Sequence, residues 1–151
     1  MKILGLDPGL TATGYGILSD HKGISFGTIR PKEKDYFKKI AFICEHISLI
    51  LRKYKPEVAS LEKAFFQKNV SSLIKISELR GAIIYLLLKN NIRVLEYTPA
   101  QIKLATTGNG RASKSQVRFI MERTILKSKK PISHHAVDAL AIAYTAMRRF
   151  R

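Results

Sequence analysis

MKILGLDPGLTATGYG, residues 1–16, combines an apolar strand with a glycine-rich turn that begins at a carboxylate. The run Ile3–Leu6 is typical of a buried strand, and Asp7 is followed at once by a Pro-Gly pair, which ends a strand and turns the chain. Residues 14–18, GYGIL, then resume a strand. We therefore expect a hairpin that places Asp7 at the edge of a sheet. On these residues alone, Asp7 is as consistent with a turn cap as with a functional carboxylate.

The composition indicates a basic globular domain with a polyanionic partner. The 151 residues, 46% of them hydrophobic, suit a single domain spanning 1–151. Lys and Arg number 27 against 11 Asp and Glu, a formal net charge of +16, which favours nucleic acid over a merely solvated basic surface. The longest apolar run, about 82–88, is far shorter than the roughly 20 residues that span a bilayer, so we expect no membrane partner.

The single cysteine and the N-terminal pattern predict a cytoplasmic location. Cys44 has no second cysteine with which to form an internal disulfide, and its apolar neighbours predict a core position. The N-terminal apolar segment is interrupted by Asp7, unlike that of a signal peptide.

Turn signals and apolar periodicity divide the chain into five strands and five helices. Strands are predicted at 3–6, 14–18, 24–29, 58–61 and 92–97. Helices are predicted at 36–54, from Asn69 or Ser71 to 89, at 99–106, from Ser113 or Ser115 to 125, and at 134–147. The order predicts an α/β fold, a five-stranded mixed sheet whose first three strands are antiparallel, flanked by helices. The helix from about Ile83 to Leu88 is apolar nearly all round, and is therefore either buried on both sides or a dimer interface.

Three of the few acidic residues lie where charges are unusual. Asp7 and Glu62 each end a predicted strand, and Asp138 lies inside an apolar helix, where an unpaired carboxylate is costly to desolvate. His135 precedes Asp138 by three residues and shares its helix face. A salt bridge explains Asp138 equally simply, and partial exposure explains His135. Oxygen ligands from separate elements suit Mg²⁺, and two such ions hydrolyse phosphodiesters, so a basic protein with this set predicts a nuclease.

At this point the motifs resemble a known family. Gly5-Leu6-Asp7-Pro8-Gly9, Thr13-Gly14-Tyr15-Gly16, Glu62-x-x-Phe65, Arg80-Gly81, Lys114-Ser115-Gln116 and His135-x-x-Asp138-Ala139-Leu140 follow one another as in the RuvC family of Holliday junction resolvases. The resemblance runs nearly the whole chain. It implies an RNase H-like fold and a homodimer that nicks four-way DNA junctions symmetrically during homologous recombination and DNA repair.

The resemblance also implies roles for individual residues. Two Mg²⁺ ions, with Mn²⁺ as a substitute, would be held by Asp7, Glu62, Asp138 and His135; many family members carry aspartate where this chain has His135. Lys103 and Lys114 would lie beside the scissile phosphate, and Phe65 would stack on unpaired bases. The residues expected to contact DNA are Phe65, Lys68, Arg80, Lys103, Arg111 and Lys114.

Three further expectations accompany these roles. The glycines after Asp7 are expected to let a phosphate approach the backbone closely. The helix around Ile83 to Leu88 is the expected dimer seam. A branch-migration helicase complex is the expected protein partner.

Two other functions remain open. A YqgF-like or RNase H-like nuclease acting on RNA shares the early aspartate, although the Glu62-x-x-Phe65 and His135-x-x-Asp138 units favour the junction resolvase. A non-catalytic junction-binding module would keep the basic surface without the chemistry, and His135 is the one feature that supports it.

Overall fold

The computed structural model describes residues 1–64, 68–127 and 131–150. One five-stranded sheet has the order β3-β2-β1-β4-β5, so that the first strand lies at its centre. β1 pairs antiparallel with β2, and β2 with β3, whereas β4 is parallel to both β1 and β5. The predicted mixed sheet with an antiparallel start is confirmed. The strands are β1 Lys2–Asp7, β2 Thr13–Ser19, β3 Lys22–Ile29, β4 Val58–Glu62 and β5 Arg93–Tyr97.

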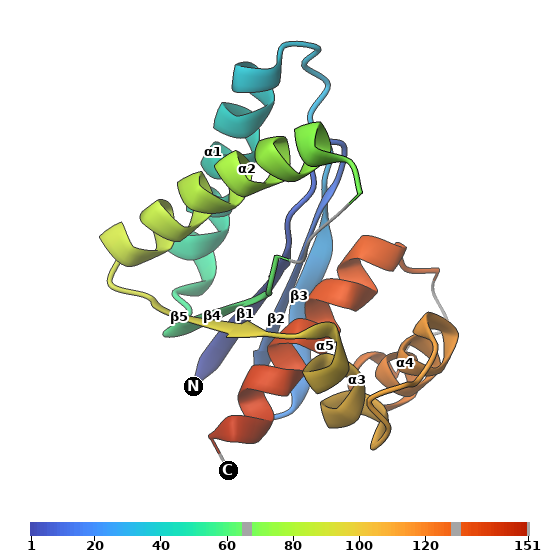
Figure 1. Ribbon diagram of the computed structural model, residues 1–151. Helices are drawn as coiled ribbons and strands as arrows, with labels where there is room; N and C mark the ends of the chain where they lie inside the picture. The colour runs from blue at the N-terminus through green and yellow to red at the C-terminus, as the bar shows by residue number, and fades with distance from the viewer. Residues whose placement is uncertain (65–67, 128–130, 151) are drawn as a thin grey trace.

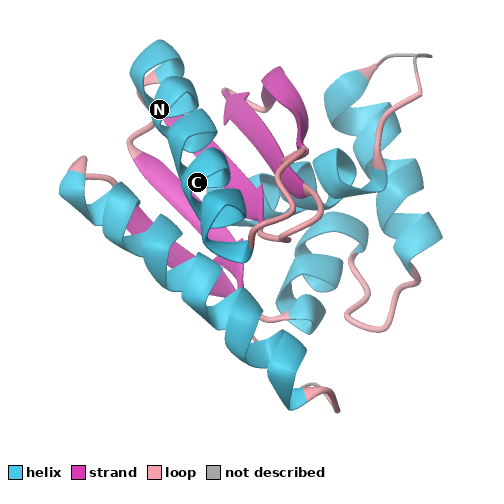
Figure 2. Cartoon of the chain, turned by 90° about the horizontal axis from the view of Figure 1, so that it is seen from above, coloured by secondary structure: helices cyan, strands magenta, loops and turns pink. Residues whose placement is uncertain are grey.

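Helices cover both faces of the sheet. α1 and α2 lie together over one face, and α5 crosses the other with α3 and α4 beside it (Figures 1 and 2). The described residues contain no helix that is long and apolar enough to cross a membrane. The helices are α1 Tyr36–Tyr54, α2 Val70–Lys89, α3 Pro99–Thr107, α4 Lys114–Met121, the π-helical turn η1 Glu122–Leu126, and α5 His134–Arg149.

Capping residues set the helix starts. The side chain of Asp35 accepts from the Lys38 backbone N–H at 2.9 Å and starts α1 at the predicted residue. Of the alternatives that the sequence leaves open, Asn69 caps α2 and Ser113 caps α4. Several boundaries differ from prediction by one or more residues, and two of them have a clear local cause. β3 begins at Lys22 because the preceding turn contains only two residues of positive φ, and α4 stops at Met121, where the chain continues as η1.

The side of the sheet that faces α5 is made of three rows of paired residues. The first row is apolar: Leu18, Ile3 and Val58. The second row is small: Gly16, Gly5 and Ser60. The third row begins with Gly14, which pairs with Asp7, and continues with Glu62 at the end of β4. Strand alternation therefore places both carboxylates beyond a floor of small residues, on the face that α5 covers.

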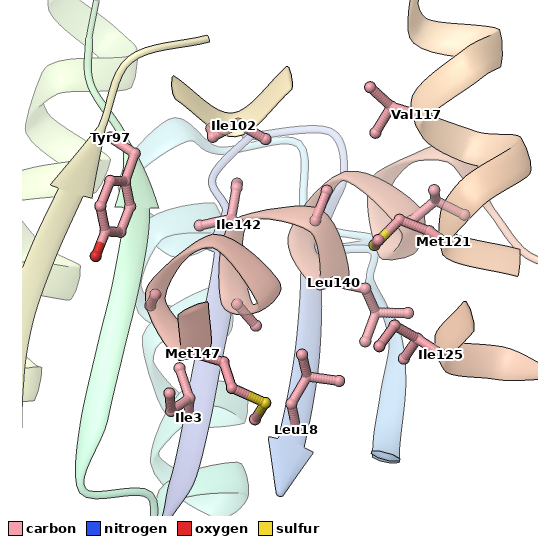
Figure 3. Close-up of a cluster of buried hydrophobic side chains, with 14 of the residues drawn as sticks. Ile3, Leu18, Tyr97, Ile102, Val117, Met121, Ile125, Leu140, Ile142 and Met147 are labelled. Carbon is pink, nitrogen blue, oxygen red and sulfur yellow. The ribbon is translucent and has the colours of Figure 1, made fainter. Parts of the chain in front are cut away.

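The glycines of this floor let α5 approach the sheet closely. A Cβ on Gly5 would lie 1.9 Å from the Ala139 carbonyl oxygen, and a Cβ on Gly14 would lie 2.0 Å from that of His135. Ser60 Oγ donates to the Ile142 carbonyl at 3.2 Å. The expectation that the glycines after Asp7 admit a phosphate is wrong for Gly14, because it faces the backbone of α5. Beyond the floor, α5 packs on an apolar cluster shared with α3 and α4 (Figure 3).

The opposite face is filled by large aliphatic side chains. Leu4 and Leu6 of β1 pack with residues of α1 and α2 in a second buried cluster, beside which Cys44 lies half-buried. Ile83 and Leu87 are fully buried in this cluster. The expected dimer seam from Ile83 to Leu88 therefore needs correction, because one face of that segment belongs to the chain's own core. Tyr85 and Leu88 are its outward residues, 66% and 57% exposed.

Candidate active site

Asp7 and Glu62 end neighbouring parallel strands. β1 and β4 pair in register up to Leu6 and Leu61, so the next residue of each strand brings a carboxylate to the same edge of the sheet. Asp7 ends β1 because Pro8 has no N–H with which to continue the ladder. The sheet thus delivers two acids side by side, 55 positions apart in the chain.

The first turn of α5 adds the remaining residues. His135 Nδ1 lies 3.3 Å from Asp7 Oδ2, and Asp138 follows one turn later on the same helix face. Ser133 caps the helix by accepting from the Ala136 N–H at 3.2 Å. The Ser133 hydroxyl also lies 2.5 Å from that of Thr28 on β3, which ties the start of α5 to the sheet. The four residues predicted as metal ligands are therefore brought to one edge of the fold.

Each of the three carboxylic acids has a raised pKa. Burial raises the pKa of Asp7 most; the hydrogen bond with His135 opposes this, and the charge of Asp138 adds to it. Burial is also the main cause of the raised pKa of Glu62, followed by repulsion from Asp7 and Asp138. The pKa of Asp138 is raised by burial and lowered in part by Lys114. Three acids that share one site and repel one another provide a set of oxygen donors that a divalent cation would stabilise.

Two lysines complete the site. A pocket of about 110 Å³ is lined by Glu62 and Asp138 together with Lys103 of α3 and Lys114 of α4. Lys114 lowers the pKa of all three acids, so its ammonium lies within electrostatic range of the cluster. It is the first residue of α4, held there by the Ser113 cap. The structure thus brings both predicted lysines to the predicted carboxylates.

The described side chains do not form a closed metal cage as they stand. Within residues 1–64, 68–127 and 131–150, no three His, Cys, Asp or Glu side chains gather closely enough to hold a metal ion. The donor chemistry nevertheless fits a hard divalent cation, because three carboxylates and one imidazole converge where like charges repel. Binding would require these side chains to rotate inward toward the cation.

The other residues predicted to contact DNA differ in their placement. Lys68 and Arg111 are exposed, as a role in binding DNA requires. Phe65 lies outside the described residues. Arg80 is only 8% exposed, and its guanidinium donates to the Glu62 carbonyl and pairs with Glu96. The structure therefore does not support the predicted DNA contact of Arg80, because its charge faces the interior.

Sequence reasoning missed the residues that seat α5. Gly5 and Ser60 lie two positions before Asp7 and Glu62, on the same side of their strands. That spacing is visible in the sequence. A small residue two positions before an acid at a strand end lies on the same side of the strand, where a helix can pack closely against it. The Thr28–Ser133 contact joins residues 105 positions apart and has no local signal.

Comparison with known proteins agrees with this arrangement. The profile of the family described as crossover junction endodeoxyribonuclease RuvC matches residues 3–146. The RuvC of Petrotoga mobilis is 41% identical over 150 residues, which cover 95% of this chain and 91% of that protein. The RuvC of Prochlorococcus marinus is 38% identical, with 97% and 95% covered. T. thermophilus RuvC, solved in complex with a Holliday junction substrate, matches with a TM-score of 0.93 at 25% identity, covering 100% of this chain and 95% of that one. The chain belongs to the RuvC family of crossover junction endodeoxyribonucleases.

Proposed function

We propose that this protein resolves four-way DNA junctions by hydrolysing one phosphodiester in each of two symmetrically related strands. The observation that carries the proposal is the convergence of Asp7, Glu62 and Asp138 from two strands and a helix, with Lys114 lining the same pocket as Glu62 and Asp138. Family membership supports the reaction, and the formal charge of +16 suits a polyanionic substrate.

Mg²⁺ is the proposed cofactor, with Mn²⁺ as a substitute. Asp7, Glu62 and Asp138 would hold the ions through carboxylate oxygens, and His135 would supply a nitrogen. When bound, the two ions activate water on one side of the phosphodiester and stabilise the leaving oxygen on the other. His135 must be neutral to act as a ligand.

The lysines act on the phosphate. Lys103 and Lys114 line the same pocket of about 110 Å³ as Glu62 and Asp138, so a phosphate bound there would meet both the cations and the carboxylates. A fixed ammonium stabilises negative charge as it develops in the transition state. Lys68 and Arg111, both exposed, extend the basic surface outward for contacts to the flanking backbone.

One experiment tests this function. The purified protein is incubated with four-way, linear and RNA–DNA hybrid substrates, with and without Mg²⁺, beside Asp7→Asn. We expect Mg²⁺-dependent cleavage of the four-way junction alone, and Asp7→Asn should bind the junction without cutting it, because an amide is a poor ligand for two cations. Preference for the hybrid would identify an RNase H-like or YqgF-like activity on RNA. Junction binding without cleavage under any metal would identify a non-catalytic binding module.

A homodimer is proposed to place two active sites on the two-fold symmetric junction. The supporting feature is a stripe along the outer face of α2, where Ile74, Tyr85 and Leu88 are 54%, 66% and 57% exposed. Gly81 lies in this stripe, and a Cβ there would meet open space, so a second helix has room to approach closely. An isologous contact of this stripe with its copy would cover these apolar side chains.

Sedimentation tests the dimer. Tyr85→Glu should shift the protein to a monomer that cuts single sites slowly and no longer makes paired nicks, because a buried glutamate would oppose its own copy. Phe37→Glu, at a residue 74% exposed on α1, is the control for adding an acid to this face. A Tyr85→Glu protein that remains dimeric would place the seam elsewhere. The branch-migration helicase partner and the cytoplasmic location stay predictions.

A further inference from the structure

Arg80 is a buried charge directly behind the active site. It lies on the inner face of α2, 8% exposed, beside the fully buried Leu79. One guanidinium nitrogen, Nη1, donates to the carbonyl oxygen of Glu62 at 2.6 Å. The other, Nη2, pairs with the carboxylate of Glu96 on β5. A single side chain thus joins α2 to the ends of two neighbouring strands.

The Glu62 carbonyl needs this donor because the sheet offers it none. The Lys63 N–H bonds to the Tyr97 carbonyl of β5 at 2.8 Å, so strand alternation directs the Glu62 carbonyl toward β1. The next residue there is Pro8, which has no N–H. Arg80 therefore replaces a missing ladder bond at the last residue of β4, and its charge makes that bond stronger than a neutral one.

Both partners of Arg80 hold its position. Glu96 supplies the opposite charge. Glu62 and Glu96 lie near one another because their strands, β4 and β5, are adjacent, and Glu96 pairs with Leu61, the residue before Glu62. A phosphate would have to displace Glu96 and open the packing around α2 to reach this guanidinium. The planar fork of arginine is suited to holding two acceptors at once, whereas a lysine ammonium is a point charge.

We propose that Arg80 is a positioning residue, which fixes the backbone at Glu62 and thereby aims the Glu62 carboxylate at the divalent cation, with Glu96 orienting its guanidinium. The inference rests on the proposed function insofar as Glu62 is taken as a metal ligand. Arg80 does not touch the substrate. It acts through Glu62 alone, as groups that orient metal ligands do in other proteins.

Direct binding of Mn²⁺ to the DNA-free protein tests this role, measured by electron paramagnetic resonance of free Mn²⁺. Arg80→Met should weaken Mn²⁺ binding by about 10- to 100-fold. Its junction Kd, measured without divalent metal, and the salt dependence of that Kd should match wild type. Arg80→Lys should recover part of the Mn²⁺ affinity. Glu96→Gln, which keeps a neutral acceptor, should give a smaller loss in the same direction and carries the test where Arg80→Met does not fold.

Matched variants separate the outcomes. Arg52→Met removes an exposed arginine from the last turn of α1 and should leave Mn²⁺ binding unchanged. Unchanged Mn²⁺ affinity in Arg80→Met and Glu96→Gln would overturn the inference, as would a weaker junction Kd whose salt slope falls by about one, the sign of a lost phosphate contact. Glu62→Gln separates the ligand role of Glu62 from the positioning role of Arg80. If Glu62→Gln binds Mn²⁺ as wild type does, Glu62 is not a ligand. If Glu62→Gln loses Mn²⁺ affinity and Arg80→Met does not, the positioning role alone is refuted.

Discussion

On the α5 side of the sheet a helix backbone rests on glycines, whereas on the α1–α2 side large aliphatic side chains fill the space between the layers. Gly5 and Gly14 leave no room for a Cβ beneath α5. On the other side, Leu4 and Leu6 meet Ile83 and Leu87 of α2 in a fully buried cluster. The same sheet therefore has two kinds of packing, one on each face.

This difference in packing suggests that one face of the sheet positions the site residues and the other mainly stabilises the fold. Backbone seated on backbone has no rotamers to adjust, so the helix backbone that carries His135 and Asp138 is held firmly against the sheet. Aliphatic packing buries more apolar surface and tolerates changes of shape, because neighbouring side chains relax around them. We therefore expect changes on the α5 side to affect cleavage, and changes on the α1–α2 side to affect stability.

The largest expected effect comes from Gly14→Ala. The new Cβ would lie 2.0 Å from the His135 carbonyl oxygen, so α5 must move. We expect a stability loss of about 3 kcal/mol or more, with loss of junction cleavage. Ile83→Val on the opposite face is the control and should lose about 0.5–1.5 kcal/mol while cleaving normally. Denaturant unfolding and a cleavage assay measure both. A Gly14→Ala protein with normal cleavage would contradict the close seating of α5.

Lys114→Ala should give the next largest effect. Its ammonium lowers the pKa of all three acids, so its loss should slow cleavage by about 100-fold with little change in junction affinity. It should also raise the pKa of the acids further, so that metal binding shifts to higher pH. Single-turnover rates and binding isotherms over a pH series check this. Loss of affinity with normal rates would make Lys114 a plain phosphate contact.

Asp7→Asn should stabilise the metal-free protein. The pKa of Asp7 is raised in the folded state, so the folded protein binds the carboxyl proton more tightly than the unfolded chain does. The stability that this proton contributes is therefore present below the ordinary Asp pKa near 4 and is lost as pH rises through the raised pKa. The amide removes this loss, so Tm at pH 7 without metal should rise by a few degrees, about 2–4 °C per kcal/mol gained. Thermal melts at pH 3 and pH 7 test the sign, since the difference should shrink in acid. A lower Tm at pH 7 would refute it.

Ser60→Ala should have the smallest effect. It removes the hydroxyl that donates to the Ile142 carbonyl at 3.2 Å but keeps the small size that the floor beneath α5 requires. We expect a loss of about 1 kcal/mol and near-normal cleavage. Urea unfolding and the junction assay measure these. Loss of cleavage here would mean that the hydroxyl, and not the size of the floor residue, seats α5.

Local sequence rules predicted the elements and the charged residues of the site. Strong caps such as Asp35 set helix starts within the chain itself, and the strand ends at Asp7 and Glu62 follow from turn residues and apolar runs. Asp138 was recognisable because a carboxylate amid apolar residues needs a reason to be there. These features depend on neighbours in the chain, which the sequence displays directly.

Features that depend on register between strands were missed. The floor of Gly16, Gly5 and Ser60 exists only once three strands are aligned. Arg80 carried a readable signal, since it shares the helical period of Leu79, Ile83 and Leu87 and so lies on the buried face of α2. The prediction of a DNA contact relied on the positive charge of Arg80 and not on its position in the buried helical period. The apolar segment from Ile83 to Leu88 was ambiguous because both its faces are hydrophobic.

The contact between His135 and Asp7 joins residues 128 positions apart. During synthesis the chain therefore exposes its basic surface and its first carboxylate long before the helix that completes the cluster has been made. Contacts of such long range close late in folding, after the local elements have formed. An unfinished or locally opened chain thus lacks the assembled centre that would cut DNA, and nuclease activity becomes a property of the fully folded protein.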